Sequence, residues 1–206
     1  ASSAPFKRIA YRDAMEIYGS DKPDLRIDLT VQDVTKVCSA TEFGPFHSGA
    51  VKAIVVSDCK LARKAIDKLC AEVEVQSGEK AYWCKVDDAG NLTGGVSKFL
   101  QDVREPLTVQ LGLKPGDFVG FTAGKLLSAQ KTAGVLRNKL GAACEGHMDA
   151  ERYEFCWIVD FPMYEIGEES GELEFCHNPF SMPAGGLETL LRAERGELDP
   201  LSITAD

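Results

Sequence analysis

The stretch VKAIVVSDCKLARKAIDKLCAEV, residues 51–73, combines an apolar run with a helical pattern that follows it at once. The run VKAIVV, residues 51–56, predicts a buried strand, and Ser57 with Asp58 offers a cap for the helix that follows. Four apolar residues recur at helical spacing and share one face: Ala62, Ile66, Leu69 and Val73. Because charged residues occupy the opposite face, this apolar stripe is expected to pack on a core rather than form a binding groove.

The same alternation of strand and helix continues along the chain. Apolar runs predict further strands at KAYWCKVD (80–87) and DFVGFTAG (117–124). Helical spacing predicts a short helix at PLTVQLG (106–112), opened by its proline, and a long helix at LLSAQKTAGVLRNKLG (126–141). Together these elements predict a compact two-layer α/β unit over residues 30–145, with a mixed sheet that carries helices on one face.

The segment before this unit, residues 1–29, begins with a short extended run at 6–9. A helix is expected next, because three residues fall on one face: Tyr11, Met15 and Tyr18. Gly19 suits the left-handed conformation that ends many helices. The following SDKPD predicts a turn, since aspartates there can bind their own backbone.

The segment after the unit, residues 146–206, is richer in strand signals. FCWIVDFPMYE (155–165) predicts a long apolar strand, and LEFCHNPF (173–180) predicts its antiparallel partner across a polar loop. GLETLLRAERG (186–196) predicts a final helix.

Composition limits the classes of function. The 206 residues are 44% hydrophobic and 27% charged, as in an ordinary globular protein. The formal charge of -9 repels nucleic acid on average, so most of any RNA partner must be held by something else. Seven cysteines without a C-x-x-C pair argue against a disulfide framework or a zinc ribbon and favour buried, reduced thiols in a cytosolic protein. No apolar run is long enough to span a membrane, and none at the start has the length of a signal peptide's core.

Two motifs that invite a functional interpretation are weak. GFTAGKL (120–126) has three residues between its glycines and Leu126 after its lysine, whereas a phosphate-binding loop needs four and a Ser or Thr. We therefore interpret Gly124 as a turn between strand and helix. His47 and His147 lack metal-ligand spacing and are expected to be surface or hydrogen-bonded polar residues.

His177 is the third histidine and the one with a functional context. It lies at the end of an expected strand, beside a turn made by Asn178 and Pro179, where an imidazole can donate to a carboxylate or phosphate. Its neighbour Cys176 points to the opposite face of a strand, so the two cannot readily share a metal or form a nucleophilic pair. An incidental strand-end histidine remains the alternative.

Four stretches identify a family resemblance. IAYRDAMEIYGSDKPDLR, GVLRNKLG, WIVDFPMYE and CHNPFSMP occur in this order, and the chain resembles the bacterial-type aspartyl-tRNA synthetases over essentially its whole length. The resemblance implies a class II synthetase, whose antiparallel catalytic sheet is interrupted by an inserted domain called the GAD domain. Residues 30–145 would be that insert, and residues 1–29 and 146–206 would be catalytic-domain segments.

The same resemblance implies roles for two residues. In the family a loop with His-His-Pro-Phe closes over aspartate and adenylate, so His177 is expected to contact this substrate. Asn178 takes the place of the second histidine and is expected near the substrate as well, where its amide can donate a hydrogen bond but carries no charge. No metal ligand is expected among the residues of this chain.

The resemblance further implies a cytoplasmic enzyme, an aspartate–tRNA ligase that uses ATP and Mg²⁺. It would form aspartyl-adenylate, transfer the aspartyl group to tRNA(Asp), or also to tRNA(Asn), and act as a homodimer away from membranes. The ATP-clamping arginines, the metal ligands and the aspartate-reading residues are expected outside this chain, which would make it an inactive fragment of the enzyme. The alternatives are a GAD-type binding module, as in a glutamyl-tRNA amidotransferase subunit, and an independent enzyme centred on His177.

Overall fold

The computed structural model describes residues 3–167, 170–176 and 180–205, and the chain divides into two compact units. The first unit is Met15–Glu154, and the second joins Ser2–Ala14 to Phe155–Asp206. Within the described ranges, no helix has the length and apolar character needed to cross a membrane. The interval 30–145 lies inside the first unit, and its assignment to an inserted domain stays a prediction.

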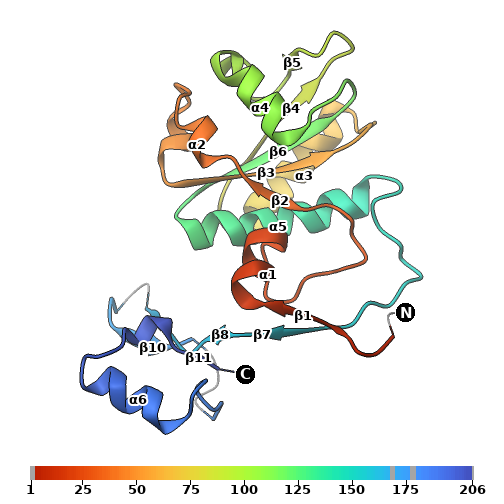
Figure 1. Cartoon of the computed structure of the whole chain (residues 1–206). Helices are drawn as coiled ribbons and strands as arrows, with labels where there is room; N and C mark the ends of the chain where they lie inside the picture. The colour runs from red at the N-terminus through yellow and green to blue at the C-terminus, as the bar shows by residue number, and fades with distance from the viewer. Residues whose placement is uncertain (1–2, 168–169, 177–179, 206) are drawn as a thin grey trace. The chain divides into compact units, whose positions relative to one another are not determined.

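The first unit is built on a five-stranded sheet with the spatial order β2-β3-β6-β4-β5 (Figure 1). Its strands are β2 (Val31–Asp33), β3 (Ala50–Val56), β4 (Ala81–Val86), β5 (Leu92–Thr93) and β6 (Phe118–Gly124). The strands expected from VKAIVV, KAYWCKVD and DFVGFTAG are all present. The predicted α/β class with a helix layer on a sheet is therefore confirmed.

The prediction of a mixed sheet is wrong, because every pair of neighbouring strands in this sheet is antiparallel. β3 and β4 run in the same direction, as expected for two strands joined through a helix. However, β6 lies between them and pairs antiparallel with both. The alternation of strands and helices in the sequence indicates that β3 and β4 run in the same direction. It does not indicate that another strand lies between them.

The first unit contains two long and two short helices among its described residues. They are α2 (Thr35–Cys38), α3 (Arg63–Ser77), α4 (Arg104–Leu111) and α5 (Leu126–Ala143), with short 3-10 helices at Gly44–His47, Ser97–Phe99 and Gln101–Val103. The long helices α3 and α5 pack against each other on one face of the sheet. The prediction of helices on one face is therefore correct for α3 and α5 only, because α2 and α4 cover the opposite face of the sheet.

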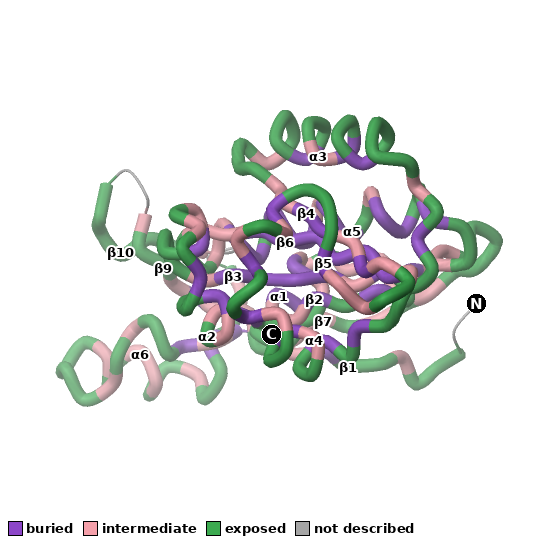
Figure 2. The backbone as a smooth tube through the Cα atoms, turned by 90° about the horizontal axis from the view of Figure 1, so that it is seen from above, coloured by how far each residue is buried: buried purple, intermediate pink, exposed green. Residues whose placement is uncertain are grey.

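The period of two along each strand explains how both faces are covered. On β3, Ile54 and Val56 join the core under the long helices, whereas Val51 and Ala53 join the core under the short ones. Figure 2 shows the central strands buried along most of their length and the outer side of α3 exposed. In α3 the predicted stripe is buried at Ile66, Leu69 and Val73 but not at Ala62, which precedes the helix.

The helix after β3 begins later than the sequence suggested. Ser57 and Asp58 do not cap it, because α3 starts at Arg63, and Asp58 has a positive φ of 46° in the turn before it. The backbone of this turn instead forms hydrogen bonds with Gly116 and Lys85. Cys59 N–H donates to the carbonyl of Gly116, and the Lys85 ammonium donates to the carbonyls of Cys59 and Leu61. These tertiary bonds override the local capping signal.

The second unit consists of short paired strands and one helix of its own. Its elements are β1 (Lys7–Ala10), β7 (Cys156–Val159), β8 (Phe161–Pro162), β9 (Tyr164–Ile166), β10 (Leu173–Phe175), β11 (Thr204–Ala205), α6 (Leu187–Glu194) and a 3-10 turn at Pro200–Ser202. The helix α1 (Tyr11–Tyr18) begins in this unit and ends in the first, where Gly19 adopts the predicted left-handed conformation.

The antiparallel pairing expected for this unit holds for β9 with β10 and for β8 with β11. It is wrong for β1 and β7, which pair in parallel from Lys7 with Cys156 to Ala10 with Val159. A parallel pair needs a long crossover, and the whole first unit lies between these two strands in sequence. The long strand expected at 155–165 is also divided, because Asp160 has a φ of 56° and Pro162 has no N–H to donate.

Candidate functional site

The segment that carries the two predicted substrate-binding residues is held on its N-terminal side by a hairpin. His177 and Asn178 themselves lie outside the described residues. Before them, β10 pairs with β9, with Phe175 opposite Tyr164 and the two ring centroids 5.0 Å apart. The backbone N–H of Cys176 donates to the carbonyl of Met163 at 3.0 Å. The antiparallel partner predicted for 155–165 is therefore confirmed up to the residue before His177.

The C-terminal side of the same segment is also held by backbone bonds. Ala184 N–H donates to the carbonyl of Thr204 at 2.8 Å, and Thr204 belongs to β11, which pairs with β8. Met163 N–H in turn donates to the carbonyl of Ile203 at 2.8 Å. The motif DFPMYE thus provides backbone partners for Cys176 and for β11, which in turn binds Ala184. Its strand pattern was visible in the sequence, whereas this anchoring role was not.

Asp160, the first residue of DFPMYE, is a conformational outlier. Its φ of 56° places a residue with a side chain in the left-handed region, and the residue is exposed. Such conformations cost free energy and are concentrated at functional sites and tight turns. The outlier marks this turn as a second point of interest in the second unit.

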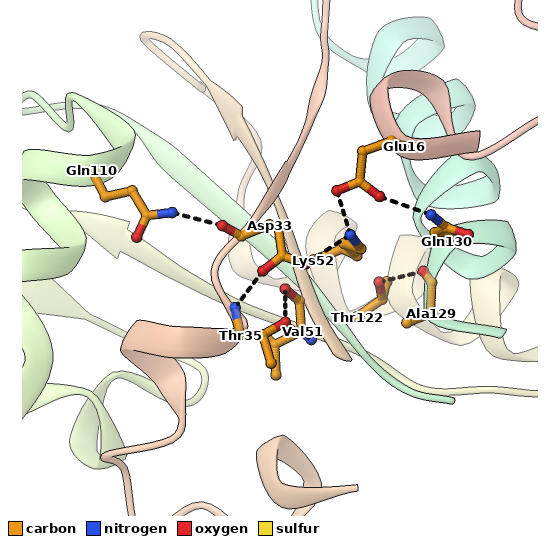
Figure 3. A network of polar contacts seen from close by, with 9 residues as sticks. All are labelled: Glu16, Asp33, Thr35, Val51, Lys52, Gln110, Thr122, Ala129 and Gln130. Carbon is orange, nitrogen blue, oxygen red and sulfur yellow. Dashed lines mark hydrogen bonds and ion pairs between the residues drawn. The ribbon is translucent and has the colours of Figure 1, made fainter. Parts of the chain in front are cut away.

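A buried lysine organises the second polar site, which lies in the first unit (Figure 3). The side chain of Lys52 on β3 is 1% exposed, and its ammonium lies 2.6 Å from Glu16 Oε1 and 2.8 Å from Asp33 Oδ2. Gln130 on α5 donates to Glu16 Oε2 at 2.8 Å. Two carboxylates therefore neutralise one buried charge, which a buried ammonium needs in order to be tolerated.

The second carboxylate, Asp33, has its own supporting bonds. It accepts the backbone N–H of Thr35 at 3.0 Å, and its carbonyl accepts the Gln110 amide at 2.6 Å. Partial burial acts to raise the pKa of Asp33, but the hydrogen bonds from Lys52 and Thr35 outweigh it and hold the pKa below its ordinary value. Through its two ion pairs, Lys52 on β3 joins the end of α1 to β2 and β3.

Sequence reasoning missed this network. The run VKAIVV predicts a buried strand but gives no partner for the charge of Lys52 within it. A lysine inside an otherwise buried strand is the signal that could have indicated a paired charge there, because lysine is almost never fully buried without a partner.

The Asp33–Lys52 pair is expected to lose its stabilising effect in acid. Because the folded-state pKa of Asp33 is depressed, its contribution is complete above the ordinary carboxyl pKa of about 4 and is lost as pH falls through the folded-state value. Urea midpoints of the chain and of Asp33→Asn should therefore differ at about pH 6 and converge toward about pH 3. Asp58→Asn serves as control, since Asp58 pairs with Lys60 on the exposed surface. A difference for Asp33→Asn that stays constant over this range would contradict the assignment.

Two of the stretches quoted for the family resemblance meet at Arg137 of α5. Arg137, in GVLRNKLG, is fully buried and donates from Nε to the carbonyl of Leu29 at 2.6 Å. Its Nη2 donates to the carbonyls of Ile27 at 2.7 Å and Asp24 at 3.0 Å, both within or beside YGSDKPDLR. The guanidinium also lies over the ring of Tyr18, 5.0 Å from its centroid. One arginine therefore fixes the fold of a segment more than a hundred residues away in sequence.

A close backbone approach accompanies this contact. A Cβ on Gly19 would lie 2.4 Å from the nitrogen of Gly134, and one on Gly134 would lie 2.2 Å from the carbonyl oxygen of Gly19. Both glycines are therefore required where the end of α1 meets α5. The aspartate turn expected at SDKPD is present here too, since Asp24 accepts the backbone N–H of Arg26 at 3.1 Å.

The other histidines and the glycine-rich stretch behave as predicted. His47 Nε2 lies 2.7 Å from the carbonyl of Thr41, and His147 Nδ1 lies 2.8 Å from Asp28 Oδ1. β6 ends at Gly124 and α5 begins at Leu126, so GFTAGKL forms the predicted turn from strand to helix. Among the described residues, no group of three His, Cys, Asp or Glu side chains could hold a metal ion.

Comparison with known proteins identifies the family of this chain. The family model described as tRNA synthetases class II (D, K and N) matches residues 1–198. The chain belongs to this family. It is 42% identical to "Aspartate--tRNA ligase" of Streptomyces coelicolor over 206 residues, which is 98% of this chain and 34% of that protein.

Two further relatives carry the same name. The chain is 44% identical over 205 residues to the Streptomyces avermitilis protein, again with 98% of this chain and 34% of the relative. It is 44% identical over 183 residues to a Streptococcus pneumoniae protein, with 87% of this chain and 31% of the relative. This class II synthetase chain therefore spans about a third of the length of these relatives.

Proposed function

We propose that this chain is part of an aspartate–tRNA ligase. The observation that carries the proposal is identity of 42% to 44% with proteins of that name, extending over 98% of the chain. The alternative of a free-standing GAD-type binding module would account for the first unit alone. The family match runs from residue 1 to 198 and so includes DFPMYE and the hairpin of the second unit.

The reaction we propose has two steps. The carboxylate of aspartate attacks the α-phosphorus of ATP, which releases pyrophosphate and leaves aspartyl-adenylate. A terminal ribose hydroxyl of tRNA then attacks the aspartyl carbonyl, and AMP leaves. In the proposed role, His177 donates a hydrogen bond to negative charge on aspartate or the adenylate, and Asn178 adds a neutral donor beside it. DFPMYE holds the residue before His177, because the carbonyl of Met163 accepts the backbone N–H of Cys176.

ATP enters as a substrate, and Mg²⁺ would neutralise its phosphates. The described part of the chain offers no group of three His, Cys, Asp or Glu side chains suited to a metal. We derive no step through the metal. The further partners we propose are tRNA(Asp), aspartate and a second copy of the enzyme, with the cytoplasm as location.

Charging of tRNA by the purified whole protein tests this proposal. We expect labelled aspartate, supplied with ATP and a tRNA pool, to become attached to tRNA in a form that mild base releases. Hybridisation of the charged tRNA to probes for tRNA(Asp) and tRNA(Asn) then distinguishes an enzyme for one acceptor from an enzyme for both. Attachment of lysine or asparagine with no attachment of aspartate would overturn the proposal.

The 206-residue chain by itself is expected to be inactive. Aspartate-dependent exchange between labelled pyrophosphate and ATP should equal the background without enzyme, because the resemblance implies that the residues that clamp ATP lie outside this chain. The chain is purified through an affinity tag, which separates it from the host's own synthetase. A mock purification from the same host provides the control. Exchange above that control would show that activation of aspartate needs only these residues.

A further inference from the structure

An apolar groove lies in the second unit, where α6 and the 3-10 turn after it meet the hairpin of β9 and β10. The groove has a volume of about 440 Å³. Among the described residues that line it, Glu194 carries the one charge. The others are apolar or aromatic: Tyr164, Leu173, Leu187, Leu190, Leu191, Ala193, Pro200 and Ile203. Such a lining suits hydrocarbon side chains rather than a charged ligand.

The apolar side of α6 is left uncovered by the second unit. None of its eight residues, all of which the structure describes, is fully buried (Figure 2). Leu187 is 69% exposed and Leu191 is 36% exposed. The helix α4 of the first unit also has eight residues, yet it buries Leu107 and Leu111. Because so short a helix is marginal in water without tertiary packing, α6 needs a partner for its apolar side.

The hairpin beside the groove has the same deficit. Leu173 and Phe175 on β10 are 44% and 51% exposed, and Ile166 on β9 is 51% exposed. A two-stranded hairpin is at best marginally stable on its own in water. The hydrophobic residues of the second unit that are described as fully buried form a short list: Ile9, Ala14, Met163, Ile203 and Ala205. The hairpin and α6 therefore need apolar cover from other residues.

A second copy of this chain and another part of the same polypeptide are the two candidates for that cover. The formal charge of -9 makes two copies of the chain repel each other. The chain spans 34% of the length of its two Streptomyces relatives. A polypeptide of their length has most of its residues outside this chain, which favours the second candidate.

We propose that the groove is the docking site for another segment of the same polypeptide, which places apolar side chains between α6 and the β9–β10 hairpin. The proposal rests on the proposed function, in which this chain is part of a longer ligase. Docking would bury Leu173, Leu187 and Leu191 and stabilise α6 through the hydrophobic effect. Since β10 ends at Phe175, shortly before His177 in the sequence, the same docking would hold the strand that precedes the predicted substrate-binding residues.

Accessibility of position 187 tests the proposal. Leu187→Cys is prepared in the 206-residue chain and in the whole protein, and alkylation of the introduced thiol by iodoacetamide is followed by peptide mass spectrometry. We expect labelling to be at least about tenfold slower in the whole protein, where the reagent reaches the thiol only through local opening. Val75→Cys is the matched control, at a position of α3 that is 88% exposed, and its labelling rates in the two proteins should agree within about twofold.

Hydrogen exchange of the unsubstituted proteins provides a second readout. The backbone amides of α6 should exchange at least about tenfold more slowly in the whole protein than in the 206-residue chain. Neither readout depends on which amino acid the enzyme activates, so failure of the aspartate assignment would leave this test valid.

Two results would overturn the proposal. One is equal labelling at position 187 and equal exchange of α6 in the two proteins, which would mean that the groove stays open. The other is protection that rises with protein concentration, which would identify a second copy as the occupant.

Discussion

Replacing His177 by alanine in the whole enzyme is expected to slow formation of aspartyl-adenylate by about 30-fold to 1000-fold. This corresponds to about 2 to 4 kcal/mol, the loss typical of one donor that stabilises developing negative charge. The expectation rests on the family resemblance of CHNPFSMP, and the residue before His177, Cys176, is held by its backbone bond to Met163. Stopped-flow or rapid-quench measurement of adenylate formation provides the rate, separately from tRNA charging.

Two matched variants give this experiment its controls. His47→Ala removes an exposed histidine that bonds only the carbonyl of Thr41 among its described contacts, so its rate should stay within about twofold of the parent. Asn178→His restores the residue that the family has at this position and should change the rate less than His177→Ala does. A melting temperature that falls in His177→Ala while the rate is unchanged would mean that the histidine is structural.

Replacing Arg137 by methionine is expected to destabilise the first unit by about 3 to 5 kcal/mol. The carbonyls of Asp24, Ile27 and Leu29 would each lose a buried, charge-assisted donor, and each unsatisfied group costs roughly 1 to 3 kcal/mol. Methionine keeps much of the side-chain volume, so the change reports the polar bonds more than a cavity. Few other single substitutions in the chain should lower the free energy of unfolding by more than this.

Urea unfolding followed by tryptophan fluorescence measures this loss. Trp83 is 8% exposed in the first unit and Trp157 is 60% exposed in the second, so a Trp157→Phe background makes the signal specific for the first unit. Lys139→Met, on the same helix, is the control, because Lys139 pairs with Glu72 near the surface and should cost about 1 kcal/mol or less. Equal effects of the two substitutions would contradict the role assigned to Arg137.

The sequence predicted the elements of the fold better than their arrangement. Apolar runs and helical spacing identified β3, β4, β6, α3 and α5, because side-chain period follows directly from local geometry. The order of the strands did not follow, since the insertion of β6 between β3 and β4 depends on contacts between distant residues. The start of α3 was misplaced for the same reason: Lys85 binds the backbone before the helix from across the sheet.

The candidate site likewise contains residues that the sequence identifies and contacts that it does not. His177 and Asn178 were identified from a short motif, which sequence alone can display. The contacts of Lys52 with Glu16 and Asp33, and those of Arg137 with Leu29 and its neighbours, join residues that no local pattern connects.

Amino-acid-dependent exchange between pyrophosphate and ATP, measured on the whole protein, determines which amino acid the enzyme activates. The family description covers D, K and N, so aspartate, lysine and asparagine are compared at equal concentration. We predict rapid exchange with aspartate and exchange at background with the other two, and the aspartate signal should fall in His177→Ala. Exchange that depends on lysine or asparagine, with none for aspartate, would contradict the assignment of this chain to an aspartate–tRNA ligase.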